Sequence, residues 1–160
     1  NYIPTLLKQH NIHRANHSAA DVVWNSTLAD IATQIAQSCT FAHQSIDGGG
    51  YGQNIAAGVP ASNIAAVVTN LWYDGEFNSF LPSYYGQANP PNFYAWGHFS
   101  QVVWKATSEI GCGTVYCSKG LGGVGSDVPP WFTVCNYRGP GNVGGLYGKN
   151  IGKPLGHPNV

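Results

Sequence analysis

Charged side chains are scarce in this sequence of 160 residues: Asp, Glu, Lys and Arg make up 9% of it, against about a quarter of a typical globular domain. The seven basic residues balance the seven acidic ones, so the formal net charge at pH 7 is zero. Binding to a nucleic-acid backbone needs a basic surface, which this composition lacks, so no nucleic-acid partner is expected. No apolar run approaches the length that spans a bilayer, and no transmembrane segment is predicted.

The four cysteines, Cys39, Cys112, Cys117 and Cys135, form no CxxC pair, which argues against a zinc ribbon or a thioredoxin-type site. An even number of cysteines without such a pair favours two disulfides, and the residues alone leave all three pairings open. The sequence also lacks an internal repeat, and its length suits a single domain over residues 1–160. Glycine and proline gather in loops and in a C-terminal extension from about residue 139.

No signal peptide is present, so we expect a mature chain from which a leader has been removed. Asn16-His17-Ser18 and Asn25-Ser26-Thr27 are sequons that allow N-glycosylation at Asn16 and Asn25. The cysteines, the sequons and the low charge together predict a secreted, extracellular protein.

Two kinds of apolar pattern predict an α+β fold. Apolar residues at i, i+3, i+4 and i+7 predict the clearest helix over 27–39, with Asn25 or Ser26 as its cap. Further helices are predicted over 6–17, from a cap at Ser62 or Asn63 to Trp72, and over 98–104; clustered β-forming residues predict strands over 110–116 and 131–137. Helices early and strands late, without regular alternation, indicate helices packed on a mainly antiparallel sheet.

The stretch GHFSQVVWK occupies residues 97–105. On a helix, Val102, Val103 and Trp104 can reach a core while His98 is presented elsewhere. Gly97 allows the chain to enter this helix tightly against a neighbour.

This stretch resembles the GHF(T/S)QVVW signature of the CAP superfamily, named for cysteine-rich secretory proteins, antigen 5 and pathogenesis-related protein 1. Further motifs of the family occur in the same order over nearly the whole chain: HNxxR at 10–14, CTFAH at 39–43, YGQN at 51–54, WY at 72–73, IGC at 110–112 and CNY…GN from 135 to 142. The sequence is most similar to fungal pathogenesis-related-1-type proteins. The resemblance implies a three-layer α-β-α sandwich with a mainly antiparallel central sheet, and the disulfides Cys39–Cys117 and Cys112–Cys135.

The resemblance also implies a cleft around two histidines and two acidic residues, which in some members holds a divalent metal. His43 and His98 match the histidines, but Gln53 stands where the first acid is expected. The second acid is expected at position 75, which is Gly75 here. We assign its role to Glu76, which a local bulge in the helix would turn toward the cleft.

A carboxamide in place of a carboxylate removes a charge and a strong ligand. No cofactor is required, and a divalent metal such as Zn or Mg on His43, His98 and Glu76 is expected to bind weakly or not at all. Ser100 lies two residues from His98, and on a helix their side chains diverge, so they form no ready pair of nucleophile and base. No catalytic residue is assigned, and binding is favoured over catalysis.

Polar residues near the N-terminus are interpreted as parts of the scaffold. His10, His13 and His17 could meet at a metal on a helix, but we expect His10 to pack locally and the other two to face solvent. Asn11 and Arg14 are expected to hydrogen-bond loops where helices meet the sheet, together with residues 136, 137 and 142.

The segment between Glu76 and Gly97 is rich in aromatic residues and stiffened by prolines. Fungal relatives bind sterols through an aromatic loop in this region, and other members hold fatty acids between helices, so the resemblance implies a lipid-binding loop. Its candidate contacts are Phe77, Phe80, Leu81, Tyr84, Tyr85, Phe93, Tyr94 and Trp96. The alternative is that these aromatics close the core and brace the loop.

These observations predict a secreted CAP-domain protein that binds a small hydrophobic ligand, a sterol or a fatty acid, in extracellular defence or, as a fungal effector, in host–pathogen interaction. Two alternatives stay open. One is a metal-dependent hydrolase that uses the cleft of histidines and acid. The other is a non-enzymatic module that binds an extracellular protein receptor or releases a peptide from a flexible C-terminal tail.

Overall fold

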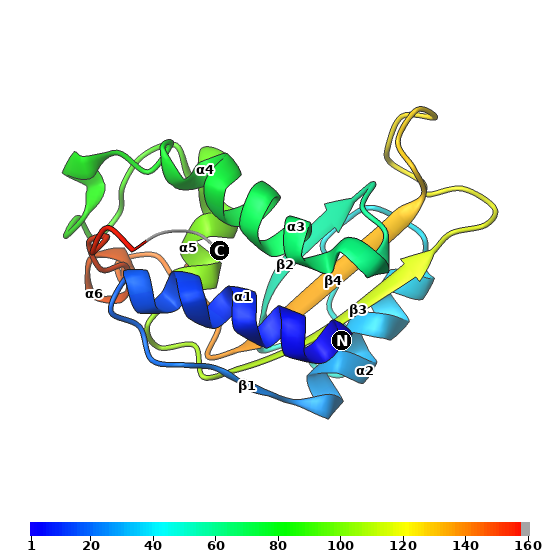
Figure 1. Ribbon diagram of the computed structural model, residues 1–160, viewed down its shortest axis with the longest axis horizontal. Helices are drawn as coiled ribbons and strands as arrows, with labels where there is room; N and C mark the ends of the chain where they lie inside the picture. Colours follow the sequence, from blue (N-terminus) through cyan, green and yellow to red (C-terminus); the bar gives the residue numbers. More distant parts are fainter. Residues whose placement is uncertain (158–160) are drawn as a thin grey trace.

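The computed structural model describes residues 1–157; the last three residues of the predicted domain lie outside the described residues. Its sheet contains β1 (Val23–Trp24), β2 (Gly52–Ala57), β3 (Glu109–Tyr116) and β4 (Trp131–Arg138), in the order β1-β3-β4-β2 (Figure 1). β1 pairs with β3 in parallel, and β3–β4 and β4–β2 are antiparallel. The mainly antiparallel sheet is therefore confirmed.

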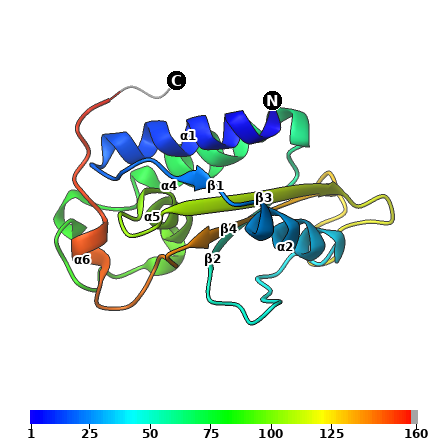
Figure 2. The ribbon, with the colours of Figure 1, turned by 90° about the horizontal axis from the view of Figure 1, so that it is seen from below.

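Helices cover both faces of this sheet (Figure 2). α2 (Ser26–Gln37) packs on one face, against β3 and β4. α1 (Tyr2–Asn16), α5 (Gly97–Val103) and a helical stretch over residues 61–77 lie on the other. The three-layer α-β-α sandwich is confirmed. Within residues 1–157 the longest helix has 15 residues, and none is long and apolar enough to cross a membrane.

α2 forms where the apolar spacing predicted it, because that spacing gives the helix one continuous buried stripe. Asn25 caps it: its Oδ1 accepts a hydrogen bond of 2.9 Å from the backbone N–H of Leu28. The helix lies so close to β3 that a Cβ at Gly111 would stand 2.2 Å from the backbone nitrogen of Ala29. Only glycine permits this approach.

Both disulfides implied by the family resemblance are confirmed. Cys112 and Cys135 face each other across β3 and β4, and the bond between them has an S–S length of 2.02 Å. Cys39, just beyond α2, is joined to Cys117 at the end of β3 with an S–S length of 2.07 Å. The first bridge therefore cross-links two strands of the sheet, and the second ties the end of α2 to the end of β3.

The helical stretch over residues 61–77 is longer and less regular than the helix predicted to end at Trp72. It runs through η1 (Ala61–Asn63), α3 (Ile64–Ala66), the π-helix η2 (Val67–Asp74) and α4 (Gly75–Phe77). The N–H of Gly75 donates to the carbonyl of Asn70, five residues back, which is the bonding of a π-helix. The local widening expected before Glu76 is present.

The prediction that His13 and His17 face solvent is wrong. Both are buried, as is His10, because the 61–77 stretch and the C-terminal segment cover α1. The ring of His13 stacks on Tyr73 with centroids 3.9 Å apart, and Nε2 of His17 lies 2.8 Å from the Tyr73 hydroxyl. In residues 1–157 these histidines take part in no cluster suited to a metal.

Residues 139–157 pack on the rest of the protein, which corrects the expectation of a flexible tail for this part of the extension; residues 158–160 lie outside the described residues. Asn142 donates to the carbonyl of Gly97, and α6 (Tyr147–Asn150) packs with Tyr147 buried. Residues 152–157, here called the C-terminal strap, cross the end of α1, where the N–H of Leu155 donates to the carbonyl of Asn16 at 2.8 Å.

The strap also contradicts N-glycosylation at Asn16. The Nδ2 of Asn16, to which a glycan would be attached, donates to Tyr73, and its Oδ1 accepts from the N–H groups of Leu155 and His157. The side chain is 6% exposed, so a glycan has no room in this fold. Asn25 is partly exposed, and its glycosylation stays a prediction.

Candidate functional site

A cleft of about 410 Å³ opens beside α5, between the start of that helix and β2. Its lining combines two imidazoles, carboxamides, glycines and two aromatic side chains: His43, Gly52, Gln53, Asn54, Phe93, Tyr94, Gly97, His98, Gln101, Gly141 and Asn142. The cleft therefore contains three of the four side chains assigned to it from the sequence, and no Asp, Glu, Lys or Arg lines it.

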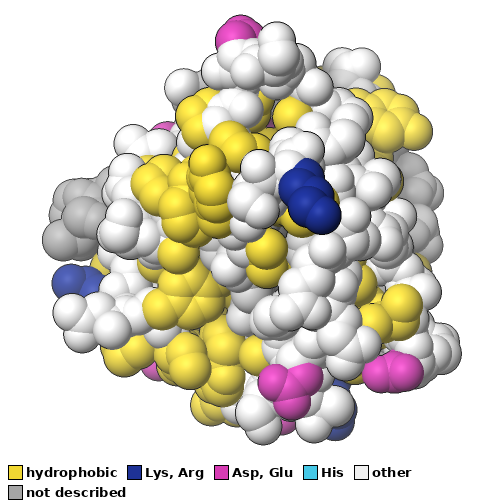
Figure 3. All heavy atoms as spheres, turned by 90° about the vertical axis from the view of Figure 1, so that its right-hand side faces the viewer, with side chains coloured by type: hydrophobic (Ala, Val, Ile, Leu, Met, Phe, Trp, Pro, Cys, Tyr) yellow, Lys and Arg dark blue, Asp and Glu magenta, His cyan; other side chains and the backbone are white. Residues whose placement is uncertain are grey.

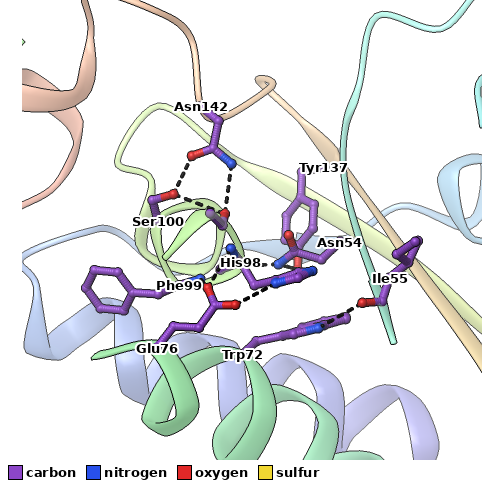
Figure 4. Close-up of polar contacts among 10 residues, drawn as sticks. Asn54, Ile55, Trp72, Glu76, His98, Phe99, Ser100, Tyr137 and Asn142 are labelled. Carbon is purple, nitrogen blue, oxygen red and sulfur yellow. Dashed lines mark hydrogen bonds and ion pairs between the residues drawn. The ribbon is translucent and has the colours of Figure 1, made fainter. Parts of the chain in front are cut away.

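His98 is held by Glu76, which approaches the first turn of α5 from α4 (Figure 4). Oε2 of Glu76 lies 2.7 Å from Nδ1 of His98. Oε1 accepts from the backbone N–H groups of His98, at 2.8 Å, and of Phe99, at 3.0 Å. The carboxylate thus satisfies donors that have no partner within the helix, and its negative charge suits a helix N-terminus.

The same contacts fix the orientation of the His98 ring. Because a carboxylate only accepts hydrogen bonds, Nδ1 carries the proton, and Nε2 is left as the nitrogen with a free lone pair when the ring is neutral. The ring lies parallel to Trp72 with centroids 6.1 Å apart. Trp72 is itself fixed by a bond of 3.2 Å from Nε1 to the carbonyl of Ile55. His98 is a rigid part of the cleft wall.

Glu76 does not line the cleft together with Gln53, which stands where the family resemblance implies the first acid. Both oxygens of Glu76 are engaged behind His98. Within residues 1–157 there is no group of three His, Cys, Asp or Glu side chains placed to hold a metal. The set His43, His98 and Glu76 is thus not assembled in this conformation, and the residues present do not fit a three-ligand metal site. Weak binding of Zn or Mg stays a prediction that depends on the two imidazoles.

Gln53 is saturated by hydrogen bonds. Its Oε1 accepts from the backbone N–H of Gln44 at 3.1 Å and lies 3.0 Å from Nδ1 of His43. Its Nε2 donates to the carbonyl of Gln44 and to Oδ1 of Asn136, both at 2.9 Å. A carboxylate could not make the last two bonds, because it has no donor. The carboxamide at position 53 therefore serves the local structure of this cleft.

Ser100 is not available as a nucleophile. Its side chain is fully buried, and its hydroxyl contacts the carbonyl of Gly97 and Oδ1 of Asn142. The expectation that Ser100 and His98 form no catalytic pair agrees with this geometry. The scaffold interpretation of Asn11 and Arg14 agrees as well: Asn11 exchanges two hydrogen bonds with the backbone of Val22, and the guanidinium of Arg14 donates to four carbonyls.

The aromatic loop divides into three parts. Phe80, Tyr84 and Trp96 are buried and belong to the core between α1, α5 and the sheet. Phe93 and Tyr94 are exposed at the rim of the cleft. The predicted loop contacts therefore do not form one continuous pocket wall, because the loop folds back and packs part of its aromatic content inward.

The third part of the loop lines a pocket of about 340 Å³ under the C-terminal strap, here called the aromatic pocket. Its lining residues are Phe77, Asn78, Phe80, Pro82, Tyr85, Lys153 and Pro154. A second pocket of about 490 Å³, here called the strap pocket, shares Phe77 and Pro154 with it and is completed by Asn16, Tyr73, Asp74, Gly156 and His157. The two pockets adjoin at the shared residues.

Burial raises the pKa of Tyr85 well above its ordinary value. Its hydroxyl is buried and has no hydrogen-bond partner among residues 1–157. Sequence reasoning selected Tyr85 but missed Asn16, Lys153 and Pro154 at these pockets. No local pattern marks those residues, because the strap reaches the pockets only through its contacts with α1.

The α-β-α sandwich, its two disulfides and the cleft between the GHFSQVVW helix and a β-strand together define a class of disulfide-linked sandwich proteins. The sequence model of the CAP family, described as the cysteine-rich secretory protein family, matches residues 7–137, and the chain belongs to that family.

Among its relatives is a probable pathogenesis-related protein of Arthroderma benhamiae, 49% identical over 152 residues, which cover 94% of this chain and 48% of that one. Fruiting body protein SC7 of Schizophyllum commune is 38% identical over 141 residues, or 86% of this chain and 64% of the other. The chain thus spans about half to two-thirds of the length of these relatives. The crystal structure of NaASP2 with Zn²⁺ shares the fold, with a TM-score of 0.73 at 22% identity, over 94% of this chain and 84% of that one.

Proposed function

We propose that this protein acts outside the cell and binds a small hydrophobic ligand, a sterol or a fatty acid, in the aromatic pocket. The observation that carries the proposal is the pair of adjoining pockets under the strap, which share Phe77 and Pro154. Their volumes fall in the range of small-molecule sites, and aromatic side chains line both: Tyr73 and Phe77 in the strap pocket, and Phe77, Phe80 and Tyr85 in the aromatic pocket.

Polar groups at the aromatic pocket suit the single polar end of such a ligand. The buried hydroxyl of Tyr85 has no hydrogen-bond partner within residues 1–157, and a ligand hydroxyl that approached it would provide one. The ammonium of Lys153, which is exposed at the pocket, would pair with the carboxylate of a fatty acid. Burial of a few hundred Å² of ligand surface would contribute about 10 kcal/mol before losses from association, which allows micromolar binding.

An extracellular location is supported by the two disulfides and by relatives with names such as "Secreted protein RBT4" of Candida albicans. Several relatives have pathogenesis-related names, and on this basis we place the ligand-binding role in defence or host interaction. The cleft with His98 and the protein-receptor interpretation remain alternatives without a specific observation in their favour.

The test is a titration with labelled cholesterol and with labelled palmitate, each delivered from cyclodextrin so that no membrane is present. Asn78→Trp places a large side chain at the aromatic pocket from an exposed position, and we expect at least tenfold weaker binding. Leu71→Trp is the matched control, since Leu71 is also exposed and lies in η2 outside both pockets.

Lys153→Ala separates the two ligands: it should weaken palmitate binding and leave cholesterol binding nearly unchanged. Saturable binding that survives in Asn78→Trp as in Leu71→Trp would overturn the aromatic pocket as the site. Absence of saturable binding of both ligands would overturn the proposal as a whole.

A further inference from the structure

Charge is missing from one end of the molecule. The segments 77–104 and 139–148 contain no Asp, Glu, Lys or Arg, and together they are here called the uncharged end. Half of the large hydrophobic side chains exposed within residues 1–157 belong to it: Leu81, Phe93, Tyr94, Val143 and Leu146. Exposed apolar side chains that gather in one region of a surface mark a site of interaction with a protein or a membrane.

Direct contacts bring the two segments together. The N–H of Gly145 donates to Oδ1 of Asn89 at 2.7 Å, and Asn142 donates to the carbonyl of Gly97 at 2.8 Å. The loop between α4 and α5 and the helix α6 accordingly lie at the same end of the molecule in both ribbon views (Figures 1 and 2). The exposed apolar side chains therefore belong to one end of the fold.

Basic side chains border this end. Lys105 and Lys149 follow directly after the two uncharged segments, and Lys153 follows four residues later. The backbone N–H of Lys105 donates to the carbonyl of Asn150 in α6 at 3.0 Å, so the segments that contain Lys105 and Lys149 are neighbours in the fold. All three lysines are exposed. Of the acidic residues near them in the fold, Glu76 is engaged by His98, and Asp74 lines the strap pocket.

The opposite end differs in charge. Hydrophobic side chains gather there too, but Asp and Glu side chains lie among and beside them (Figure 3). Tyr116 is 54% exposed at the end of β3, and Asp127 lies in the loop that joins β3 to β4. Among the described residues, the α6 end differs in that its exposed aromatic residues lie in segments without Asp or Glu.

We propose that the uncharged end docks on the surface of a phospholipid bilayer. Phe93 and Tyr94 enter the interfacial layer, where amphipathic aromatic side chains are favoured, and the lysines contact lipid phosphates. Tyr94 is suited to this position because 97% of its side chain is exposed and its hydroxyl can stay at the headgroup level. The partner is a membrane rather than a protein because the surface pairs an apolar centre with cations that match anionic headgroups.

This inference does not depend on the proposed ligand, because Phe93 and Tyr94, the side chains that enter the membrane surface, line neither pocket under the strap, although Lys153 belongs both to the docking surface and to the aromatic pocket. The two proposals are complementary: a protein that exchanges a hydrophobic ligand with a membrane needs a surface that approaches the membrane. Each can fail while the other holds.

The test is cosedimentation with sterol-free phosphatidylcholine vesicles, with and without phosphatidylserine. Each lysine near an anionic surface contributes about fivefold in affinity, so phosphatidylserine should strengthen binding by about a hundredfold. High salt should remove most of that gain. Replacement of Lys105, Lys149 and Lys153 by Ser should abolish the gain, whereas replacement of Lys8 and Lys119, the matched control, should leave it.

Tyr94→Ser should weaken binding about tenfold on both kinds of vesicle, while Tyr116→Ser, from the opposite end, should bind like the unchanged protein. Equal binding by Tyr94→Ser and Tyr116→Ser, or no binding to either vesicle by the unchanged protein, would overturn the inference. Titration of Tyr94→Ser with cholesterol from cyclodextrin distinguishes the proposals: Tyr94 lines the cleft but neither pocket under the strap, so binding in the aromatic pocket predicts an unchanged ligand affinity.

Discussion

Acid should destabilise this protein through three buried histidines of α1. Burial lowers the pKa values of His10, His13 and His17 to about 4, from an ordinary value near 6.5. The folded protein therefore holds these side chains neutral under conditions in which the unfolded chain binds protons. The stability they provide is present above pH 6.5 and is lost as the pH falls toward 4.

The hydrogen bonds show why the charged form is disfavoured. Nδ1 of His10 donates to the carbonyl of Leu6, so Nε2 accepts from the hydroxyl of Tyr137. Nδ1 of His17 likewise donates to the carbonyl of Gly152, and Nε2 accepts from the hydroxyl of Tyr73. A second proton on either ring would force the tyrosine hydroxyl to turn its own hydrogen away from the ring, at a position where both tyrosines are buried.

Between pH 7.5 and pH 5.0, a shift of this size costs about 2 kcal/mol for each histidine, or about 6 kcal/mol for all three. A domain of this size is stable by roughly 5–15 kcal/mol, so the loss would be a large part of the total. The measurement is urea denaturation followed by tryptophan fluorescence at pH 7.5, 6.0 and 5.0.

Two variants identify the groups responsible. His13→Phe keeps a ring stacked on Tyr73 but removes one titrating group, and should reduce the acid-induced loss by about a third. His43→Phe, in which an exposed histidine is replaced, is the control and should leave the loss unchanged. A free energy of unfolding that differs by less than about 1 kcal/mol between pH 7.5 and 5.0 would refute this reasoning.

Three further predictions concern the cleft and the disulfides. Glu76→Gln should destabilise the protein by about 1–2 kcal/mol in urea denaturation, because it removes the charged partner of His98 and of the α5 terminus, whereas Asp30→Asn, at an exposed acid of α2, should have little effect. Gln53→Glu should lower the free energy of unfolding by about 2 kcal/mol, because the new oxygen faces the acceptors of Gln44 and Asn136. It should leave zinc affinity unchanged in calorimetry; a marked rise in that affinity would show that the cleft side chains converge on a metal. Replacing Cys112 and Cys135 by Ala should cost about 3.5 kcal/mol and replacing Cys39 and Cys117 about 4.5 kcal/mol, since the loops closed span 23 and 78 residues. The reverse order of thermal stability would contradict the entropic account.

Local sequence patterns were sufficient to predict the elements whose apolar or β-forming residues follow a regular pattern along the chain. The i, i+3, i+4 spacing identified α2, and the β-forming clusters identified β3 and β4 within two residues at each end. β2 was not predicted because its sequence, GQNIAA, has little β propensity and forms a strand only by pairing with β4. The short β1 likewise depends on its parallel partner β3.

Part of the candidate site could be found only through motifs that are far apart in the sequence. The family resemblance selected His43, Gln53 and His98, which the fold brings to one cleft. It could not show that Glu76 lies behind His98 instead of beside Gln53, because that depends on the exact helical turn before it. The strap pockets were missed for a related reason: residues 152–157 have no periodic pattern, and the hydrogen bonds that position them come from the other end of the chain.

The π-helix η2 connects these features. Within it, Trp72 faces the ring of His98 in the cleft, while the next residue, Tyr73, stacks on His13 and lines the strap pocket. The residues that follow divide in the same way: Glu76 bonds to His98, and Phe77 separates the two pockets under the strap. A regular α-helix would change the angular position of every residue after the widened turn relative to those before it. The cleft and the pockets are therefore placed by one irregularity, and a change that restores regular helical bonding there should disturb both together.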